Sequence, residues 1–310
     1  MSKWRTTAAA VRVLISLSEQ HAKPEEPTEI DHPDVPRGTM SNSNFQVPVV
    51  HQASSAIASM RIAQLWRYPV KSLLGERLPT LRLVDDGIEG DRMWGIQDRR
   101  DGRILTARRE PRLLFASSRL AGSDLPVITL PDGEEMAGTG PVTDAALSAW
   151  LGKPVALVAA SESDTARAEY FADATDDASQ AIEWTMPKGR FVDAFPVLVI
   201  STAGLRSGAV AYPAGAWDVR RFRPNILIQL NGEGWAEDAW ADRQLSVGSA
   251  QLIPRQRCIR CTMVNRAQRG LDTDVNIFKT LHRTHGGKAG MWTQVMQPGT
   301  ISEGDMVEIA

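Results

Sequence analysis

The sequence is poor in cysteine, since its 310 residues include only two, Cys258 and Cys261. Two cysteines cannot form the disulfide framework of a small secreted domain, and they are too few to hold a four-cysteine iron–sulfur cluster. A fused ferredoxin module is therefore excluded. A reducing compartment, the cytoplasm, is the default expectation for such a chain.

The sequence also lacks a long apolar run and an excess of charge. Its longest candidate membrane segment, residues 8–17, includes Arg12 and is far shorter than the roughly 20 residues that a spanning helix needs. The 35 basic and 37 acidic residues give a net charge of −2, which offers no support for nucleic-acid binding. We therefore expect neither a transmembrane segment nor a nucleic-acid partner.

Composition changes near residue 60. Residues 1–59 contain several prolines, acidic clusters and a polar run at 41–44, and such a segment buries too little apolar surface to offset its ordering entropy. We expect residues 1–59 to form a disordered N-terminal arm. Two globular parts are expected to follow it, residues 60–185 and residues 186–310.

Both globular parts have the pattern of short strands. Asp101-Gly102 separates two such runs, 93–98 and 103–107, and is a hairpin signal. The other predicted strands are 62–67, 77–84, 113–120, 127–130, 197–201, 226–230, 251–254, 291–296 and 306–309. Helices are predicted only at 143–151 and 274–285. The fold class is therefore mainly β with a few helices, organised as β-barrel-like domains.

Both cysteines lie in one basic stretch, residues 255–264, where neighbouring arginines favour a thiolate. If this stretch is a strand, Cys258 and Cys261 face opposite sides and cannot easily form a disulfide. A zinc site with His282 and His285 has poor spacing for a zinc finger. Two buried cysteines, or one thiolate that binds a metal carried by its own organic ligand, both remain open.

Several separate motifs, in the same order, resemble one protein family. Residues 62–72, 90–94 and 105–113 resemble the β-barrel domain that precedes MOSC domains. Residues 193–196, 221–225, 258–261 and 297–305 resemble the MOSC domain itself, which is named after the C-terminal domain of molybdenum-cofactor sulfurase. The resemblance covers about residues 60–310, and it implies an N-terminal β-barrel domain followed by a MOSC β-barrel domain.

The resemblance extends to the amidoxime-reducing components of mitochondria and their bacterial counterparts. In that family the molybdenum cofactor is a molybdenum ion held by a pterin dithiolene and one protein cysteine. The resemblance implies that Cys261 is the metal ligand and the centre of catalysis. It implies that the pterin and its phosphate are bound by Lys71, Ser72 and Arg92, with Ser201, Thr202, Arg221, Arg223 and Asn225 in the same cavity. Arg221 and Arg223, two apart on an expected strand, would face one side.

The implied activity is the reduction of N-hydroxylated substrates, such as amidoximes and hydroxylamines. The glycine-containing segments 232–234 and 286–290 match neither the dinucleotide-binding pattern nor the P-loop. Electrons are therefore expected from a separate flavin or haem protein. The alternative is a non-catalytic carrier of the molybdenum cofactor or of sulfur.

Overall fold

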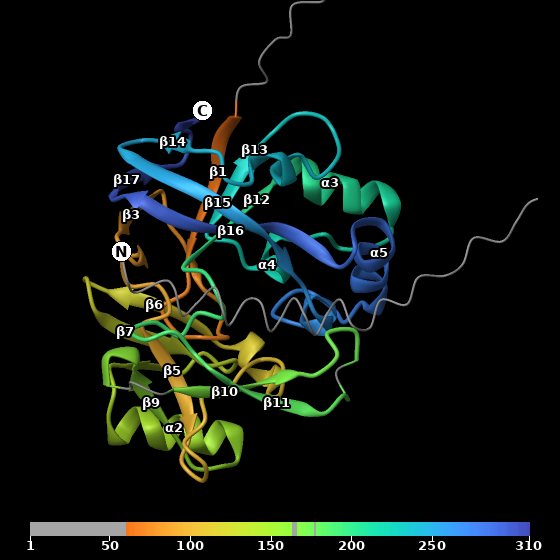
Figure 1. The fold of residues 1–310 in the computed structure, drawn as a ribbon. Coiled ribbons are helices and arrows are strands. Elements are labelled where there is room, and N and C mark those ends of the chain that lie inside the picture. Colours follow the sequence, from red (N-terminus) through yellow and green to blue (C-terminus); the bar gives the residue numbers. More distant parts are fainter. Residues whose placement is uncertain (1–59, 163–165, 177) are drawn as a thin grey trace, which may run out of the picture.

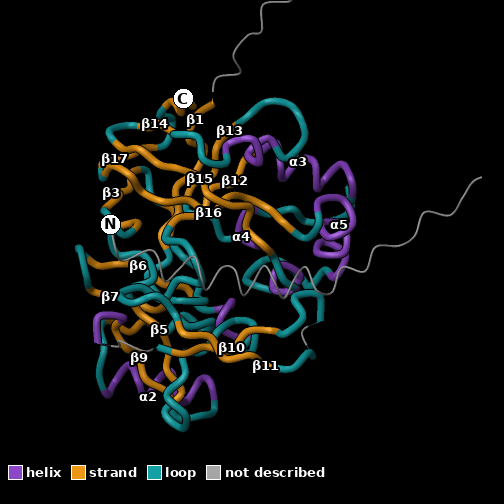
Figure 2. The backbone as a smooth tube through the Cα atoms, in the orientation of Figure 1, coloured by secondary structure: helices purple, strands orange, loops and turns teal. Residues whose placement is uncertain are grey.

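The computed structural model describes residues 60–162, 166–176 and 178–310, so the predicted N-terminal arm lies outside the described residues. The chain has an upper part built around strands β1 and β12–β18, and a lower part that contains β5–β11 and helix α2 (Figure 1). The connections between the two parts are largely loops (Figure 2).

The upper part is a closed seven-stranded β-barrel. Its strands in spatial order are β1 (Met60–Arg67), β13 (Ile226–Gln229), β12 (Val197–Ser201), β16 (Lys288–Gln297), β15 (Ala250–Ile259), β14 (Leu245–Val247) and β18 (Met306–Ile309). The barrel closes because β1 pairs antiparallel with both β13 and β18. The prediction of a mainly β fold with barrels is confirmed.

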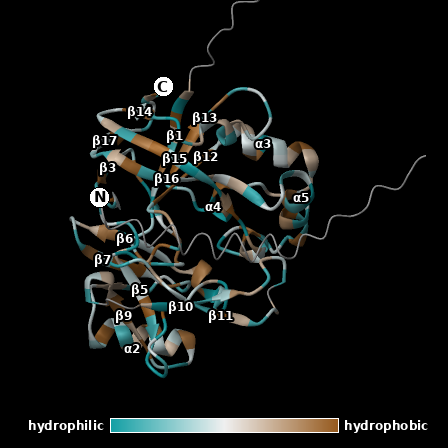
Figure 3. Cartoon of the chain, viewed as in Figure 1, coloured by the Kyte–Doolittle hydropathy of each residue, from teal (hydrophilic) through white to brown (hydrophobic). Residues whose placement is uncertain are grey.

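The barrel core is aliphatic, and the first strand contributes to it. Ile62 and Leu65 of β1 pack in one buried cluster with Val199, Ile228 and Leu252, and these apolar strands stand out in Figure 3. A small sheet of β3 (Thr80–Val84), β4 (Gly87–Ile88) and β17 (Gly299–Ser302) lies against the same core, and β2 (Glu76–Arg77) pairs with β1. Segments from both ends of the chain thus share this core, and the predicted boundary at residues 185–186 stays a prediction.

The lower part has its own core. Its sheets consist of β5 (Trp94–Asp98) with β9 (Val155–Ala159), β6 (Ser117–Ala121) with β7 (Leu125–Thr129) and β8 (Glu135–Ala137), and β10 (Arg167–Phe171) with β11 (Ala181–Thr185). Helix α2 (Pro141–Leu151) places Leu147 and Leu151 against Ile96, Ile128 and Leu157 of these strands. Short 3-10 turns η1 (Pro111–Phe115) and η2 (Ala160–Glu162) complete it.

Two predicted strands in the lower part are wrong. The segment 103–107 is not a strand, because β5 takes β9 as its ladder partner and leaves only a single bridge between Gln97 and Ile104. The segment 113–120 begins as η1, since Pro111 fixes a helical start there, and becomes strand only at Ser117. The predicted helix 143–151 is confirmed, with Gly152 in the left-handed conformation at its end.

Three helices cover one side of the barrel (Figure 1). They are α3 (Thr202–Ala211), α4 (Val219–Phe222) and α5 (Val275–His285), with the turns η3 (Ala236–Trp240) and η4 (Thr262–Asn265) beside them. Ile277, Phe278 and Leu281 of α5 are buried against Phe222 and Val264. Among the residues that the structure describes, no helix has the length and apolarity to cross a bilayer.

A candidate cofactor site between the barrel and the lower part

Three predicted cofactor-binding residues share an unusual backbone conformation. In the described part of the chain, the non-glycine residues with positive φ are Ser72 at 70°, Arg92 at 51°, Arg223 at 51° and Asp242 at 59°. A non-glycine side chain is uncommon in this region, and such strain concentrates at ligand sites. The prediction made from the motifs and the strain seen in the backbone therefore coincide at Ser72, Arg92 and Arg223.

Tyr68 brings two of these arginines together. The Cζ atoms of Arg92 and Arg223 lie 4.6 Å and 4.4 Å from the centroid of its ring, a distance at which a cation is attracted to an aromatic face. The hydroxyl of Tyr68 donates to the carbonyl of Pro224 at 3.0 Å. Burial raises the pKa of Tyr68 to about 12, so the ring stays neutral beneath the two cations.

Asn225 holds the frame of the site rather than an open face of it. Its Nδ2 donates to the carbonyl of Trp66 and to Asp91 Oδ1, both at 3.2 Å, and its Oδ1 accepts from the Leu198 amide at 3.1 Å. Arg92 Nη1 donates to the same Oδ1 and to Asp91. Asn225 is therefore engaged at both side-chain atoms and ties β1 to β12.

Arg223 is the residue of the site that most needs an anion. It is buried, its Nη1 is shielded from solvent, and that nitrogen has no hydrogen-bond partner among the described residues. Burial lowers the pKa of its guanidinium to about 10. A buried cation without a partner is costly, so this arrangement fits the binding of a phosphate or another anionic group.

We expect Arg223→Met to stabilise the cofactor-free protein. Methionine keeps an apolar stem over Tyr68 and removes an unsatisfied donor, whose burial costs about 1–3 kcal/mol. Urea unfolding of the cofactor-free protein is the measurement. The matched control is Arg221→Met, which should destabilise the protein, and an equal loss of stability in both variants would show that Arg223 is a structural residue.

Arg221 differs from Arg223 in what its guanidinium contacts. Its nitrogens donate to four backbone carbonyls, those of Ala216, Val264, Arg266 and Asp272, at 2.7–3.2 Å. The expectation that Arg221 and Arg223 face one side of a strand is wrong. Arg221 lies in the short helix α4, and Arg223 is the left-handed residue that ends it. Arg221 therefore fixes the loop that follows Cys261.

Lys71 belongs to a buried network centred on Asp193. The Asp193 carboxylate accepts from Lys71 Nζ at 2.5 Å, from Arg108 Nη2 at 2.6 Å and from the Tyr170 hydroxyl at 2.6 Å. Lys71 Nζ also donates to the carbonyl of Phe191. Arg108 and Tyr170 of the lower part thus bind Asp193, which lies in the segment leading into the barrel strand β12.

The charged groups of this network strongly shift one another's pKa values. Burial alone would raise the pKa of Asp193, but the charges of Arg108 and Lys71 outweigh it and hold this pKa well below its usual range. Burial lowers the pKa of Lys71 although Asp193 opposes the shift. Burial likewise acts to lower the pKa of Arg108, and the charge of Asp193 reverses this to a net increase.

Cys261 lies where β15 has ended. The strand stops at Ile259, and Cys261 is the extended residue that caps η4, so the expectation that both cysteines lie on one strand is wrong. Cys261 is free and half-buried, and the amide of the next residue, Thr262, donates to the Ala174 carbonyl at 3.1 Å. The adjacent Thr262 has a buried Oγ1 without a partner in the described residues.

Cys258 has a different environment from Cys261. It is buried with Ala194, Leu198 and Trp292 in a small apolar cluster. Burial raises the pKa of the Cys258 thiol to about 11, which keeps it a neutral thiol at physiological pH. Of the two cysteines, Cys261 is the half-buried one and Cys258 is buried.

Two other predicted residues lie apart from this cluster. The Ser201 hydroxyl caps α3 by accepting from Gly204 N at 2.9 Å, and it donates to buried Glu237. The Thr202 hydroxyl donates to the Leu230 carbonyl and accepts from the Leu230 amide, both at 3.1 Å. Ser201 is three strand residues, or about 10 Å, beyond Leu198, which contacts Asn225. The assignment of Ser201 and Thr202 to the cofactor stays a prediction.

The two histidines considered for zinc do not gather around the cysteines. His285 Nε2 lies 2.8 Å from Asp238 Oδ2, and its ring stacks on Trp235 at 4.4 Å. His282 is exposed on α5. Over residues 60–162, 166–176 and 178–310, no three histidine, cysteine or acidic side chains are arranged to hold a metal.

Tyr68, Arg108, Tyr170 and Asp193 were not predicted as site residues. Tyr68, Arg108 and Asp193 lie inside the motifs on which the resemblance depends, so the signal for them was present. Tyr170 lies outside every motif, and only the fold brings the hairpin β10–β11 to Asp193.

Comparison with known proteins decides the family. Residues 59–177 match the MOSC N-terminal beta barrel domain, and residues 187–308 match the MOSC domain. The chain is a MOSC-domain protein. The site described above lies between these two matched regions, because Lys71, Arg108 and Tyr170 come from the first and Asp193 and Cys261 come from the second.

Curated relatives of this MOSC-domain protein include two amidoxime-reducing components and a sulfurase. It is 26% identical over 294 residues to Mitochondrial amidoxime-reducing component 1 of Homo sapiens, covering 79% of this chain and 82% of that protein. The mouse protein of the same name is 27% identical over 288 residues, with 79% and 81% covered. Molybdenum cofactor sulfurase of Oryza sativa subsp. japonica is 25% identical over 265 residues, and the match covers 74% of this chain but only 31% of the sulfurase.

Proposed function

We propose that this protein is a molybdenum-cofactor-dependent oxidoreductase that reduces N-hydroxylated substrates such as amidoximes and hydroxylamines. The observation that carries the proposal is that Arg260 Nη1 donates to the Phe222 carbonyl at 2.8 Å. This bond joins the segment of the half-buried free thiol Cys261 to that of the strained and unsatisfied arginine Arg223. The near full-length relation to the amidoxime-reducing components favours this reading over the sulfurases, of which the chain spans about a third.

The donors at the site fit an anionic pterin cofactor. Arg223 Nη1 lacks a hydrogen bond in the described residues, and the side-chain hydrogen bonds of Arg92 to Asp91 and Asn225 use its Nη1. Lys71 Nζ has three protons and two partners. Guanidinium and ammonium donors of this kind suit a phosphate, and the Cys261 thiolate suits a soft metal. Lys71, Ser72, Arg92, Arg223 and Cys261 would hold the cofactor.

The net reaction breaks the N–O bond of the substrate, takes up two electrons and two protons, and releases the oxygen as water. When bound, the molybdenum cofactor supplies the two-electron chemistry of this cleavage. The protein residues have other tasks: Cys261 binds the metal through sulfur, and Arg92 and Arg223 neutralise the anionic part of the cofactor. Asp193 holds Lys71 and Arg108 in fixed positions through hydrogen bonds to its carboxylate.

The test of the proposal is metal analysis of the purified protein followed by reduction of benzamidoxime with dithionite-reduced methyl viologen as electron donor. We expect about one molybdenum per chain and formation of benzamidine. Stoichiometric zinc in place of molybdenum would contradict the proposal. The cytoplasmic location and a separate flavin or haem donor stay predictions that this assay does not address.

The second candidate is a non-catalytic carrier of the molybdenum cofactor or of sulfur. The observation in its favour is the relation to Molybdenum cofactor sulfurase, of which the match covers 31%. Bound molybdenum without turnover of benzamidoxime or of an N-hydroxylamine, together with transfer of the cofactor to a cofactor-free acceptor enzyme, would favour the carrier.

A further inference from the structure

The outer face of α5 has two cations that form no ion pair within the described residues, and the acid at its N-terminus, Asp274, caps the helix and accepts from the Tyr212 hydroxyl. Many exposed arginines of this protein pair with a carboxylate, as Arg77 does with Glu303 and Arg167 with Glu183. Lys279 and Arg283 are also exposed, yet their side chains form neither an ion pair nor a hydrogen bond within the described residues. The helix itself, Val275–His285, contains no acidic residue.

The arrangement of these charges is unfavourable for the helix alone. Lys279 and Arg283 are four residues apart, so they lie on one face, where like charges repel by a few tenths of a kcal/mol. Arg283 lies in the last turn, where the helix macrodipole favours a cation, but Lys279 lies in the middle of the helix. Helix stability therefore does not account for the pair.

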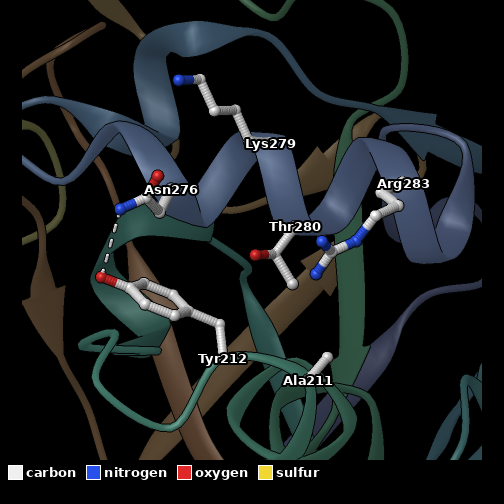
Figure 4. A pocket seen from close by; sticks show the side chains of 6 residues that line it. All are labelled: Ala211, Tyr212, Asn276, Lys279, Thr280 and Arg283. Carbon is white, nitrogen blue, oxygen red and sulfur yellow. Dashed lines mark hydrogen bonds between the residues drawn. The ribbon is translucent and has the colours of Figure 1, made fainter.

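A hollow of about 340 Å³ lies beside this face, between the end of α3 and α5. It is lined by Ala211, Tyr212, Asn276, Lys279, Thr280 and Arg283. In Figure 4 the Asn276 amide points to the Tyr212 hydroxyl, with 3.4 Å between them, and Arg283 lies beside Thr280 above Ala211, while Lys279 extends away from Tyr212. The neighbouring Val210 and Val275 are 60% and 50% exposed. Apolar side chains beside unpaired cations are typical of a protein-binding surface.

The inner face of α5 connects this surface to Cys261. The Phe278 amide donates to Asn265 Oδ1 at 2.9 Å, and the Asp274 amide donates to the Asn265 carbonyl at 2.8 Å. Asn265 ends the turn η4, in which the Val264 amide donates to the Cys261 carbonyl at 3.2 Å. Two hydrogen bonds and one short turn thus separate the helix backbone from Cys261.

We propose that the α5 surface, formed by Lys279, Arg283, Tyr212, Asn276, Val210 and Val275, is the docking site for an acidic electron-transfer protein. This inference rests on the proposed function, which requires electrons from a separate protein. The unpaired cations attract the acidic surface of the donor, and the hollow accepts a side chain from it. The path through Phe278, Asn265 and Val264 leads from the surface to Cys261.

The first test measures binding without turnover. Cofactor-free protein is titrated with an acidic flavodoxin at low ionic strength by calorimetry. We expect binding that weakens steeply with added salt and that falls roughly tenfold or more in the Lys279→Glu/Arg283→Glu variant. Arg61 is an exposed arginine on β1 whose side chain bonds only the Gly304 carbonyl among the described residues. Arg61→Glu is the charge-matched control for the single variants Lys279→Glu and Arg283→Glu, and it should stay within about twofold of wild type while each of them weakens binding.

The second test uses the molybdenum-loaded protein and separates this inference from the proposed function. We expect Lys279→Glu/Arg283→Glu to slow benzamidoxime reduction with reduced flavodoxin but not with dithionite-reduced methyl viologen. Loss of flavodoxin binding without any turnover in wild type would leave the docking surface supported and the proposed function contradicted. Three results would overturn the docking proposal. The first is turnover together with equal flavodoxin binding by the double variant and the control. The others are no flavodoxin binding at all, and saturation of the hollow by inorganic phosphate alone.

Discussion

Replacing Cys261 with alanine should remove both bound molybdenum and the reduction of benzamidoxime. Cys261 is the half-buried cysteine of the pair and caps η4 just beyond the end of β15. The amide of the next residue, Thr262, donates to the Ala174 carbonyl at 3.1 Å, so this turn contacts the segment that follows β10. Loss of a metal ligand should cost more than the roughly 10–100-fold that follows loss of an outer-shell partner. Molybdenum content after desalting and the rate of benzamidine formation are the two measurements.

Cys258→Ala is the matched control for Cys261→Ala. The Cys258 sulfur is buried among Ala194, Leu198 and Trp292 and carries a raised thiol pKa of about 11. Its replacement removes one small buried group and should leave the molybdenum content within about twofold of wild type, at a modest cost in stability. Equal molybdenum in wild type and Cys261→Ala, or loss of molybdenum only in Cys258→Ala, would contradict the assignment of the ligand.

The sequence is informative about the site where its signal is local. The motifs single out the segments around Lys71, Arg92 and Arg223. The structure adds that Ser72, Arg92 and Arg223 in these segments have a left-handed backbone conformation. Strand parity at Cys258 and Cys261 was a local argument too, but it assumed that the strand continues. The strand ends at Ile259, because the chain turns there into η4.

Other features depend on contacts between distant segments and have no local signal. The motif around Arg221 predicts a phosphate-binding residue. In the structure its guanidinium binds four carbonyls, three of them in a loop more than 40 residues away. The sequence around Tyr170 gives no sign of a site residue, and only the fold brings the hairpin β10–β11 close enough for its hydroxyl to bind Asp193. Pairing of β5 with β9 instead of residues 103–107 is likewise decided by the packing of the lower core.

Asp193→Asn should be the most destabilising single change at the site. Within the described residues, this carboxylate is the acid that pairs with buried Lys71 and with the mostly buried Arg108, and asparagine keeps its shape while removing its charge. The Asp193 side chain is 35% exposed, so solvent screening should bring the loss below the roughly 3–5 kcal/mol that follows removal of one partner of a fully buried ion pair. Chemical denaturation of the cofactor-free protein at neutral pH measures this loss. Asp101→Asn, in an exposed pair with Arg103, is the control and should cost at most about 1 kcal/mol.

The pH dependence of the Asp193→Asn effect identifies its cause. The pKa of Asp193 is held well below its usual value in the folded state. Its contribution to stability is therefore fully present above the unfolded-state pKa of about 3.9, and it is lost as the pH falls through the folded-state pKa. The difference in unfolding free energy between wild type and Asp193→Asn should be constant near neutral pH and should shrink below about pH 4. A difference that stays constant down to acid unfolding would mean that asparagine disturbs packing, and that charge neutralisation of Lys71 and Arg108 is not what Asp193 supplies.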